Sequence, residues 1–201
     1  MAPFTFTRYR AAAAVAAAAI VAFAACESDT SSPTAPVQPA APIQPNAAKT
    51  HTHGAHGGPV ALTPEMLQAI ARVRNATAVF HDITRAQAAG YDVQFPAGCA
   101  ALPGTGAQGF HWINNGLVDD KVELLKPELV MYEPKPGGGM QLVGVDYVVP
   151  LSLSAEPPTL LGVPFAPLPE LGVWALHIWA WRPNPDGMFA MWNPRVSCAN
   201  Q

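Results

Sequence analysis

Two histidines stand next to tryptophan in runs of residues that favour β-strands. His111 lies in the run Phe-His-Trp at 110–112, and His177 lies in the run Leu-His-Ile-Trp at 176–179. A histidine in a strand is half-buried, and a buried polar ring needs a partner. Imidazole is also the commonest metal-ligating side chain. Both histidines are therefore candidate metal ligands, and the alternative is that each makes a structural hydrogen bond.

Two carboxylates accompany these histidines in the chain. Glu133 and Asp146 lie in the runs 128–133 and 140–149, which predict a hairpin. If the loop closes symmetrically, both carboxylates fall on one face but about four residues apart, roughly 13 Å at the rise of a strand. That spacing disfavours a site with both carboxylates unless the register slips. Two histidines and one carboxylate suit a divalent transition metal such as Zn, Fe or Cu.

Trp179 and Trp181 are candidates for the lining of a ligand cleft. Alternation along a predicted strand at 173–181 places His177 and these two tryptophans on one face. Small-molecule pockets are mostly apolar with a few polar groups, which this combination offers. Tryptophan also packs in cores with its N–H paired, and core packing is the alternative role.

Three further histidines, His51, His53 and His56, stand in a segment with Gly and Ala spacers. Such a tract can capture a divalent ion, and it can equally be a solvated linker. Ordering the segment costs conformational entropy, so we expect any ion to bind there with low affinity.

Several classes of chemistry have no counterpart in the sequence. There is no Gly-x-Ser-x-Gly elbow and no Cys-x-x-Cys-His, and the glycines at 137–139 lack the Lys-Ser/Thr of a phosphate-binding loop. Lysine and arginine are scattered, so we do not expect nucleic-acid binding. No residue is assigned a catalytic role, and a non-catalytic protein is favoured over an enzyme.

A helix is predicted to begin at Thr63, whose hydroxyl can cap the first turn, with Pro64 at the first helical position. Apolar residues recur at intervals of three and four up to Ile83. Gly90 can close the helix. The weak helix formers at 75–77 can break it into two shorter helices.

The rest of the chain favours strands separated by Pro and Gly. Strands are predicted at 110–113, 128–133, 140–149 and 173–181, with a return at 188–192 and a proline-rich loop at 157–169. The predicted fold is a single α+β domain over 60–201, in which an N-terminal helix or helix pair packs on an antiparallel sheet.

The N-terminus has the pattern of an export signal. Arg8 and Arg10 precede an apolar run that ends in Phe-Ala-Ala before Cys26, so residues 1–25 are predicted to be a signal peptide. The pattern resembles the lipobox of bacterial lipoproteins, which implies a lipid on Cys26, although Phe23 stands where an aliphatic residue is usual. An ordinary secretory peptide or an uncleaved anchor is the alternative.

Residues 26–59 follow as a tether rich in Pro, Ala and His. Glu27 after the cysteine implies, within the lipoprotein pattern, release toward the outer membrane. Loss of the two signal-peptide arginines leaves nine basic residues against fourteen acidic ones, a net charge of about −5.

Cys99 and Cys198 remain once the lipid-bearing cysteine is set aside. Exported domains rarely leave thiols unpaired, so we expect a disulfide between them. Two separate free thiols are the alternative.

Several motifs together resemble a family of exported bacterial proteins that has no assigned activity. They are His-Trp-Ile-Asn at 111–114, Pro-Glu-Leu-Val-Met-Tyr-Glu-Pro at 127–134, Val-Gly-Val-Asp-Tyr at 143–147, Leu-His-Ile-Trp at 176–179, Asn-Pro-Asp-Gly-Met-Phe at 184–189, Trp-Asn-Pro at 192–194 and Cys198. The resemblance implies that His111, Glu133, Asp146 and His177 belong to one site, and it implies no activity.

The sequence therefore predicts a protein of the bacterial cell envelope, held at the outer membrane by a lipid and facing the periplasm. We expect it to bind a metal ion or small ligand at the sheet face that bears His111 and His177. The alternative is an interaction or structural protein without a metal site, whose partner is another envelope protein.

Overall fold

The structure, a computed structural model, describes residues 59–201. The predicted signal peptide, Cys26, the tether up to residue 58 and its three histidines lie outside the described residues. The elements are helices α1 (Pro64–Thr77), η1 (Ala78–His81) and α2 (Ile83–Ala88), and strands β1 (Val93–Leu102), β2 (Gly106–Ile113), β3 (Leu129–Pro134), β4 (Met140–Pro150), β5 (Thr159–Leu160), β6 (Val163–Pro164), β7 (Ala166–Leu168) and β8 (Val173–Ile178).

The helical segment follows its sequence signals closely. The Thr63 side chain accepts a hydrogen bond from the Met66 backbone N–H, and Pro64 is the first residue of α1. The α-helix stops at Thr77, where the predicted break becomes a 3₁₀ turn. Gly90 has a φ of 98°, the left-handed conformation that ends a helix without strain only at glycine.

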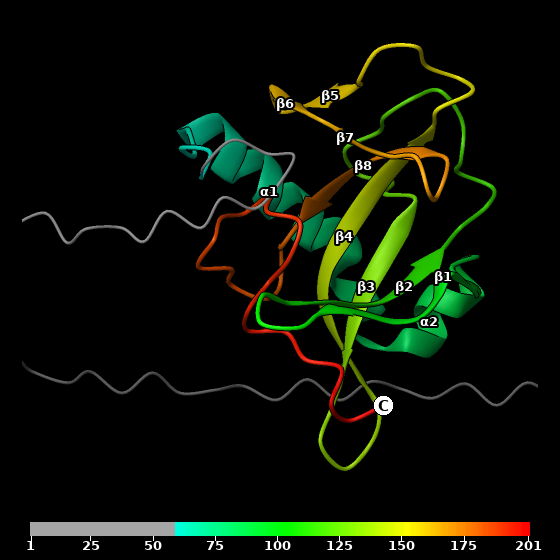
Figure 1. Cartoon of the computed structure of the whole chain (residues 1–201), viewed down its shortest axis with the longest axis vertical. Coiled ribbons are helices and arrows are strands. Elements are labelled where there is room, and N and C mark those ends of the chain that lie inside the picture. Colours follow the sequence, from blue (N-terminus) through cyan, green and yellow to red (C-terminus); the bar gives the residue numbers. More distant parts are fainter. Residues whose placement is uncertain (1–58) are drawn as a thin grey trace, which may run out of the picture. The chain divides into compact units, whose positions relative to one another are not determined.

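The sheet is antiparallel and has the strand order β1-β2-β3-β4-β8-β7, with β5 and β6 forming a separate two-stranded pair (Figure 1). The predicted hairpin is present as β3 and β4. The described residues therefore form a single α+β domain, as predicted.

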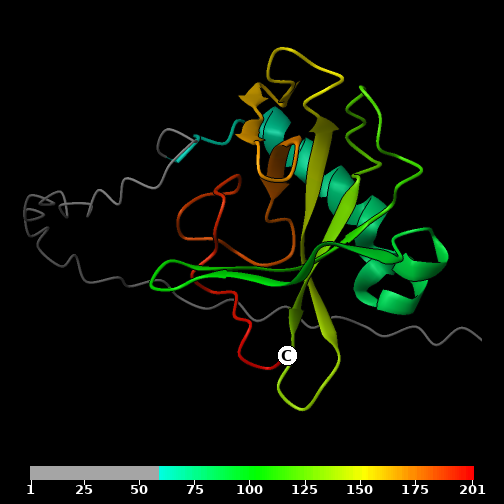
Figure 2. The same ribbon diagram turned by 45° about the vertical axis from the view of Figure 1, so that its right-hand side comes forward.

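One face of this sheet is covered by α1, which crosses behind β3 and β4 in both views (Figures 1 and 2). Ile70 and Val73 of α1 pack there against alternate residues of the central strands, including Val145 and Leu176. This cluster is the main apolar core of the domain.

The opposite face carries two smaller apolar clusters. Met131, Val143 and Trp179 belong to one of them. Leu129 and Val148 belong to the other. Polar side chains on this face therefore have apolar neighbours and little contact with solvent.

The sheet is curled, so its two edge strands approach the same place. Phe95 of β1 and Leu168 of β7 stand at opposite ends of the strand order, yet they line one cavity. Register shifts in the β1–β2 pair accompany the curl, as extra residues bend a strand. Figure 2 shows β1 and β2 bending away from the direction of β3 and β4.

Two predicted boundaries are wrong. The predicted strand at 173–181 ends at Ile178, and residues 188–192 form turns instead of a returning strand. The backbone N–H of Trp179 donates to the Met188 carbonyl, but a ladder does not continue from that bond. Conversely, the proline-rich loop contains short strands, including β7 at the sheet edge.

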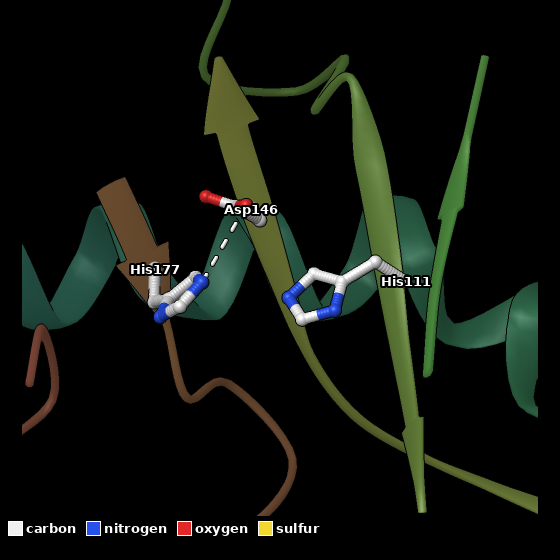
Figure 3. A group of neighbouring side chains, drawn as sticks. All are labelled: His111, Asp146 and His177. Carbon is white, nitrogen blue, oxygen red and sulfur yellow. Dashed lines mark ion pairs between the residues drawn. The ribbon is translucent and has the colours of Figure 1, made fainter. Parts of the chain in front are cut away.

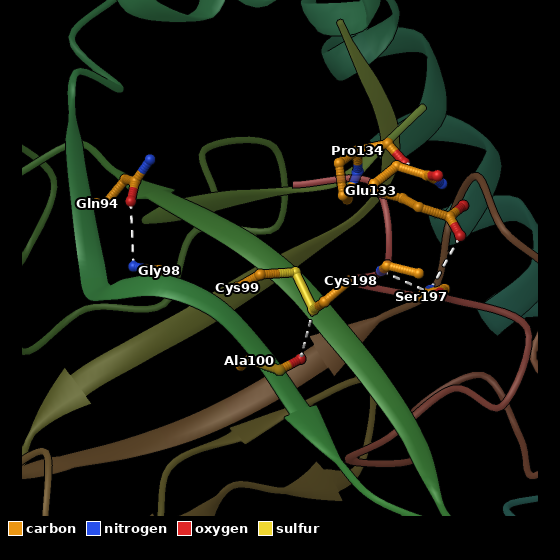
Figure 4. The surroundings of a disulfide bond; sticks show 10 residues. Gln94, Gly98, Cys99, Ala100, Glu133, Pro134, Ser197 and Cys198 are labelled. Atoms are coloured by element: carbon orange, nitrogen blue, oxygen red, sulfur yellow. Dashed lines mark hydrogen bonds between the residues drawn. A yellow bond between two sulfur atoms is a disulfide. The ribbon is translucent and has the colours of Figure 1, made fainter. Parts of the chain in front are cut away.

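The expected disulfide joins Cys99 of β1 to Cys198 near the C-terminus (Figure 4), with an S–S distance of 2.02 Å. It closes the C-terminal segment onto β1. Within residues 59–201, no helix is long and apolar enough to cross a membrane.

Candidate metal centre

His111, Asp146 and His177 converge on the face of the sheet turned away from α1 (Figure 3). They come from β2, β4 and β8, three strands far apart in the sequence. One imidazole nitrogen of each histidine and one carboxylate oxygen all lie within 4.8 Å of one another. The three residues are 2%, 5% and 3% exposed, so the group is buried.

Strand register explains half of this convergence. Asp146 and His177 are directly opposite one another in the β4–β8 pair, and such cross-strand neighbours touch. His111 is two strands away from Asp146, with β3 between them. The curl of the sheet brings its ring to 5.5 Å from that of His177, centroid to centroid.

A backbone contact fixes the chemistry of His177. Its Nδ1 lies 3.0 Å from the carbonyl oxygen of Met191, which can only accept, so Nδ1 carries the proton and donates. The Nε2 of His177 then faces Asp146, 3.5 Å from its Oδ2. Without a proton on Nε2, this nitrogen and the Asp146 Oδ2 are both hydrogen-bond acceptors, and they face one another in a buried place. Such a contact is stable only with a cation between the two atoms.

Two polar atoms of the group make no hydrogen bond to any described residue. They are the Nδ1 of His111 and the Oδ1 of Asp146, and both are fully buried. Buried polar atoms almost always have a partner, and one left unpaired costs about 1–3 kcal/mol. The group therefore has unused capacity to hold a cation or a small polar ligand.

Burial keeps His111 in its neutral form. Loss of hydration, with a smaller contribution from the neighbouring His177, lowers its pKa to about 4, although Asp146 acts in the opposite direction. A neutral imidazole has a free lone pair, which is the form that ligates a metal.

A small cavity lies next to the group. His111, Asp146 and His177 all line it, together with apolar residues of the sheet and its edges. Its volume is about 20 Å³. That space suffices for one water molecule and falls far short of the several hundred Å³ of a typical organic-ligand site.

The structure places Glu133, the other predicted carboxylate ligand, outside this group. Glu133 pairs with Gln141 across the hairpin, whereas Asp146 pairs with Leu129. Its carboxylate forms an ion pair of 2.9 Å with Arg182 and accepts from the Ser197 backbone N–H. Glu133 thus lies four residues along β3 from Leu129, the partner of Asp146. At about 3.3 Å per residue the two carboxylates are roughly 13 Å apart along the strands, as predicted.

Trp179 and Trp181 do not line the cavity. Trp179 is buried beside His177, with ring centroids 5.8 Å apart, and its N–H donates to the Ala190 carbonyl. Trp181 lies on the side of α1, where its N–H donates to Thr77. Alternation failed for Trp181 because β8 ends three residues earlier, at Ile178.

Two features of the site were missed in the sequence. The Met191 carbonyl that orients His177 is a backbone group, and the sequence carries no signal for it. Gln108 lines the cavity because a bulge with Gly109 in a left-handed conformation, φ 86°, interrupts β2. A glycine inside a strand is a signal for such a bulge, but the strand was predicted to begin at Phe110, one residue after Gly109.

Comparisons of this chain with protein-family models, with curated proteins and with solved structures find no match. The functional argument therefore depends on the geometry of the site.

Proposed function

We propose that this protein binds one divalent transition metal ion through His111, Asp146 and His177. The observation that carries the proposal is the burial of two imidazoles and one carboxylate within 4.8 Å of one another, with buried polar atoms left unpaired. A buried Asp needs a counter-charge, and two neutral imidazoles supply none.

A proton is the competing cation. A protonated His177 would form an ion pair with Asp146, whose nearest atoms are 3.5 Å apart. That ion pair would leave the buried Nδ1 of His111 without a partner, whereas a metal ion would also bind the neutral ring of His111. The Nδ1–H of His177 donates to a backbone carbonyl, the usual outer partner of a metal-bound histidine.

The donor set favours Zn, Fe or Cu. Two imidazole nitrogens with one carboxylate oxygen suit these ions, which bind such atoms at about 2.1 Å. Two ligands of one ion are then at most about 4.2 Å apart. At the tetrahedral angle the separation is about 3.4 Å, so ligand atoms that lie up to 4.8 Å apart in the structure would approach one another by up to about 1.4 Å through side-chain rotation.

We also propose that the protein acts outside the cytoplasm, anchored in the bacterial cell envelope through a lipid on Cys26. The disulfide between Cys99 and Cys198 supports an oxidising compartment. The export pattern of residues 1–25 and the lipobox resemblance support the anchor. Labelling of growing cells with a radioactive or alkyne fatty acid tests the anchor, and loss of label in Cys26→Ser is expected.

Metal analysis tests the site. The full chain is purified without chelator or histidine tag, in a background where His51, His53 and His56 are each changed to Gln. This background removes the competing tract. We expect about one equivalent of Zn, Fe or Cu, or uptake of one equivalent of added Zn²⁺ or Co²⁺ in a calorimeter.

The variants His111→Gln and His177→Gln are expected to bind the ion at least about 100-fold more weakly, because each loses a direct ligand. His81→Gln is the matched control, since His81 packs edge-to-face against Trp181 and lies outside the group. Less than a tenth of an equivalent in the purified chain, with no heat on addition of metal, would overturn the proposal.

A further inference from the structure

The cavity beside the metal centre has a buried inner wall and a partly exposed rim. The inner wall holds the three candidate ligands and apolar residues such as Leu129 and Ala175. The rim is formed by half-buried residues on or next to the two edge strands β1 and β7, namely Phe95, Pro96, Gln108, Leu168 and Leu171. The cavity therefore lies between the metal centre and solvent.

Three protein ligands do not complete the coordination of a transition metal. A structural zinc site is closed by four protein ligands, whereas a site with three keeps at least one position for an exogenous ligand. Among residues 59–201, the group contains no fourth His, Cys, Asp or Glu. Because all three candidate ligands line the cavity, an open position of an ion bound to them would face it.

The cavity limits what that position can take. Its volume of about 20 Å³ holds one water molecule, so a linear ligand bound to the ion by one end can extend only toward the partly exposed rim, and the walls are mainly apolar. Gln108 is the one lining residue besides the three ligands that carries a polar side chain. Within the described part of the chain, no hydrogen bond ties the Gln108 amide to another residue, so it is free to serve a ligand in the cavity.

We propose that the bound ion keeps one exchangeable coordination position that accepts a single ligand of one to three heavy atoms. Water or hydroxide occupies it at rest, and a small linear anion can replace it. The Gln108 amide donates a hydrogen bond to this ligand, and the rim at Phe95 and Leu168 excludes ligands as large as a ring. This inference depends on the proposed metal site.

Cobalt supplies a direct readout, because the visible absorption bands of Co²⁺ respond to a change of ligand. The full chain in the triple-Gln tract background is loaded with Co²⁺ and titrated with azide and, separately, with imidazole. We expect azide to shift the bands with saturation. We expect imidazole at the same concentrations to leave them unchanged.

Two variants test the roles of the cavity residues. Gln108→Leu keeps the volume and removes the donor, so azide is expected to bind about tenfold more weakly while Co²⁺ affinity is unchanged. Leu168→Ala widens the rim, and imidazole is then expected to shift the bands. A thermal unfolding midpoint within a few degrees of the parent confirms that each variant folds.

The outcomes separate this inference from the metal site itself. Failure to bind Co²⁺ overturns the proposed function and the inference with it. Binding of Co²⁺ with no response to azide overturns the inference alone and indicates closed coordination. A response to imidazole equal to that for azide in the parent overturns the size limit, and an unchanged azide affinity in Gln108→Leu overturns the role of that amide.

Discussion

A single backbone contact decides which nitrogen of His177 is available. The Met191 carbonyl takes the proton on Nδ1 as a hydrogen bond, which leaves Nε2 for Asp146 and the candidate ion. Without that contact the ring could present either nitrogen or rotate, and a buried ligand would lose its orientation. The site therefore depends on residues that supply no side chain to it.

Glu128 is a buried carboxylate outside the metal centre. It is 2% exposed and accepts a hydrogen bond from the Val148 backbone N–H. Burial raises the pKa of Glu128 to about 8, and the hydrogen bonds lower it only in part. The nearby charges of Asp146 and Asp119 act in the raising direction, so Glu128 is neutral in the folded protein at pH 7.

This shift predicts how stability depends on pH. The folded state holds the Glu128 proton up to about pH 8, whereas the unfolded state releases it near the ordinary value of 4.5. Stability is therefore fully present below pH 4.5 and falls as pH rises toward 8, at up to about 1.4 kcal/mol per pH unit. Urea unfolding from pH 6.5 to 8.5 measures the slope.

Glu128→Gln is the matched variant, since Gln mimics the neutral carboxyl and keeps an acceptor for Val148. We expect the stability of the variant to fall much less than that of the parent as pH rises from 6.5 to 8.5. The window begins at 6.5 because the lowered pKa of His111 contributes the opposite slope, a gain of stability between about pH 4 and 6.5. Equal slopes in both proteins would show that Glu128 is ionised in the folded state.

At the scale of elements, the bulge in β2 holds the strand that carries His111. Gly109 has a φ of 86°, and a Cβ placed on it would lie 2.3 Å from the Tyr132 carbonyl oxygen on β3. Only a glycine permits this close approach. The bulge is thus a condition for the position of His111, two residues further on.

Gly109→Ala is therefore expected to destabilise the fold by about 2–4 kcal/mol, as β2 must shift away from β3. It is also expected to weaken metal binding by displacing His111. Gly98→Ala is the control, because Gly98 has a φ of 88° but no atom near the added Cβ. Chemical unfolding of both variants separates the cost of a positive φ, which both share, from the cost of the clash with Tyr132, which only Gly109→Ala has. An equal loss of unfolding free energy in the two variants would show that the structure relieves the clash at no cost.

Local signals predicted most of the elements. The Thr63 cap, the break at Thr77 and the hairpin of β3 and β4 all follow from residue types and short spacings. Residues 188–192 resemble a strand in composition but form turns, because their carbonyls serve Trp179 and His177 instead of a ladder. These hydrogen bonds come from residues that lie outside this segment of the sequence, so the local pattern of residues 188–192 gives no sign of them.

The candidate site was predictable only in part, for a related reason. His111, Asp146 and His177 were identified from their types, but alternation places residues on faces and does not bring β2 to β8. The curl of the sheet does so, and it depends on the bulges in β1 and β2. Gln108 and the Met191 carbonyl became visible only with that three-dimensional arrangement.

At the scale of the whole domain, the C-terminal segment is a strap across the face that bears the metal centre. It contacts His177 through Met191, pairs Asn193 with Ala107 of β2, and ends in the disulfide of Cys198 (Figure 4). The disulfide therefore holds in place the carbonyl that orients a candidate ligand. Its loss should affect the site as well as the stability of the fold.

The double variant Cys99→Ser, Cys198→Ser tests this link, and it avoids thiol reductants, which bind metal ions themselves. The bridge spans 99 residues, and the chain-entropy argument gives a loss of up to about 4.7 kcal/mol for such a loop. Metal affinity, measured well below the unfolding midpoint, is expected to fall about 10- to 100-fold, the usual effect of losing an outer-shell partner. A loss of stability with unchanged affinity would show that the Asn193–Ala107 bridge alone holds the strap over His177, and that the disulfide serves only the fold.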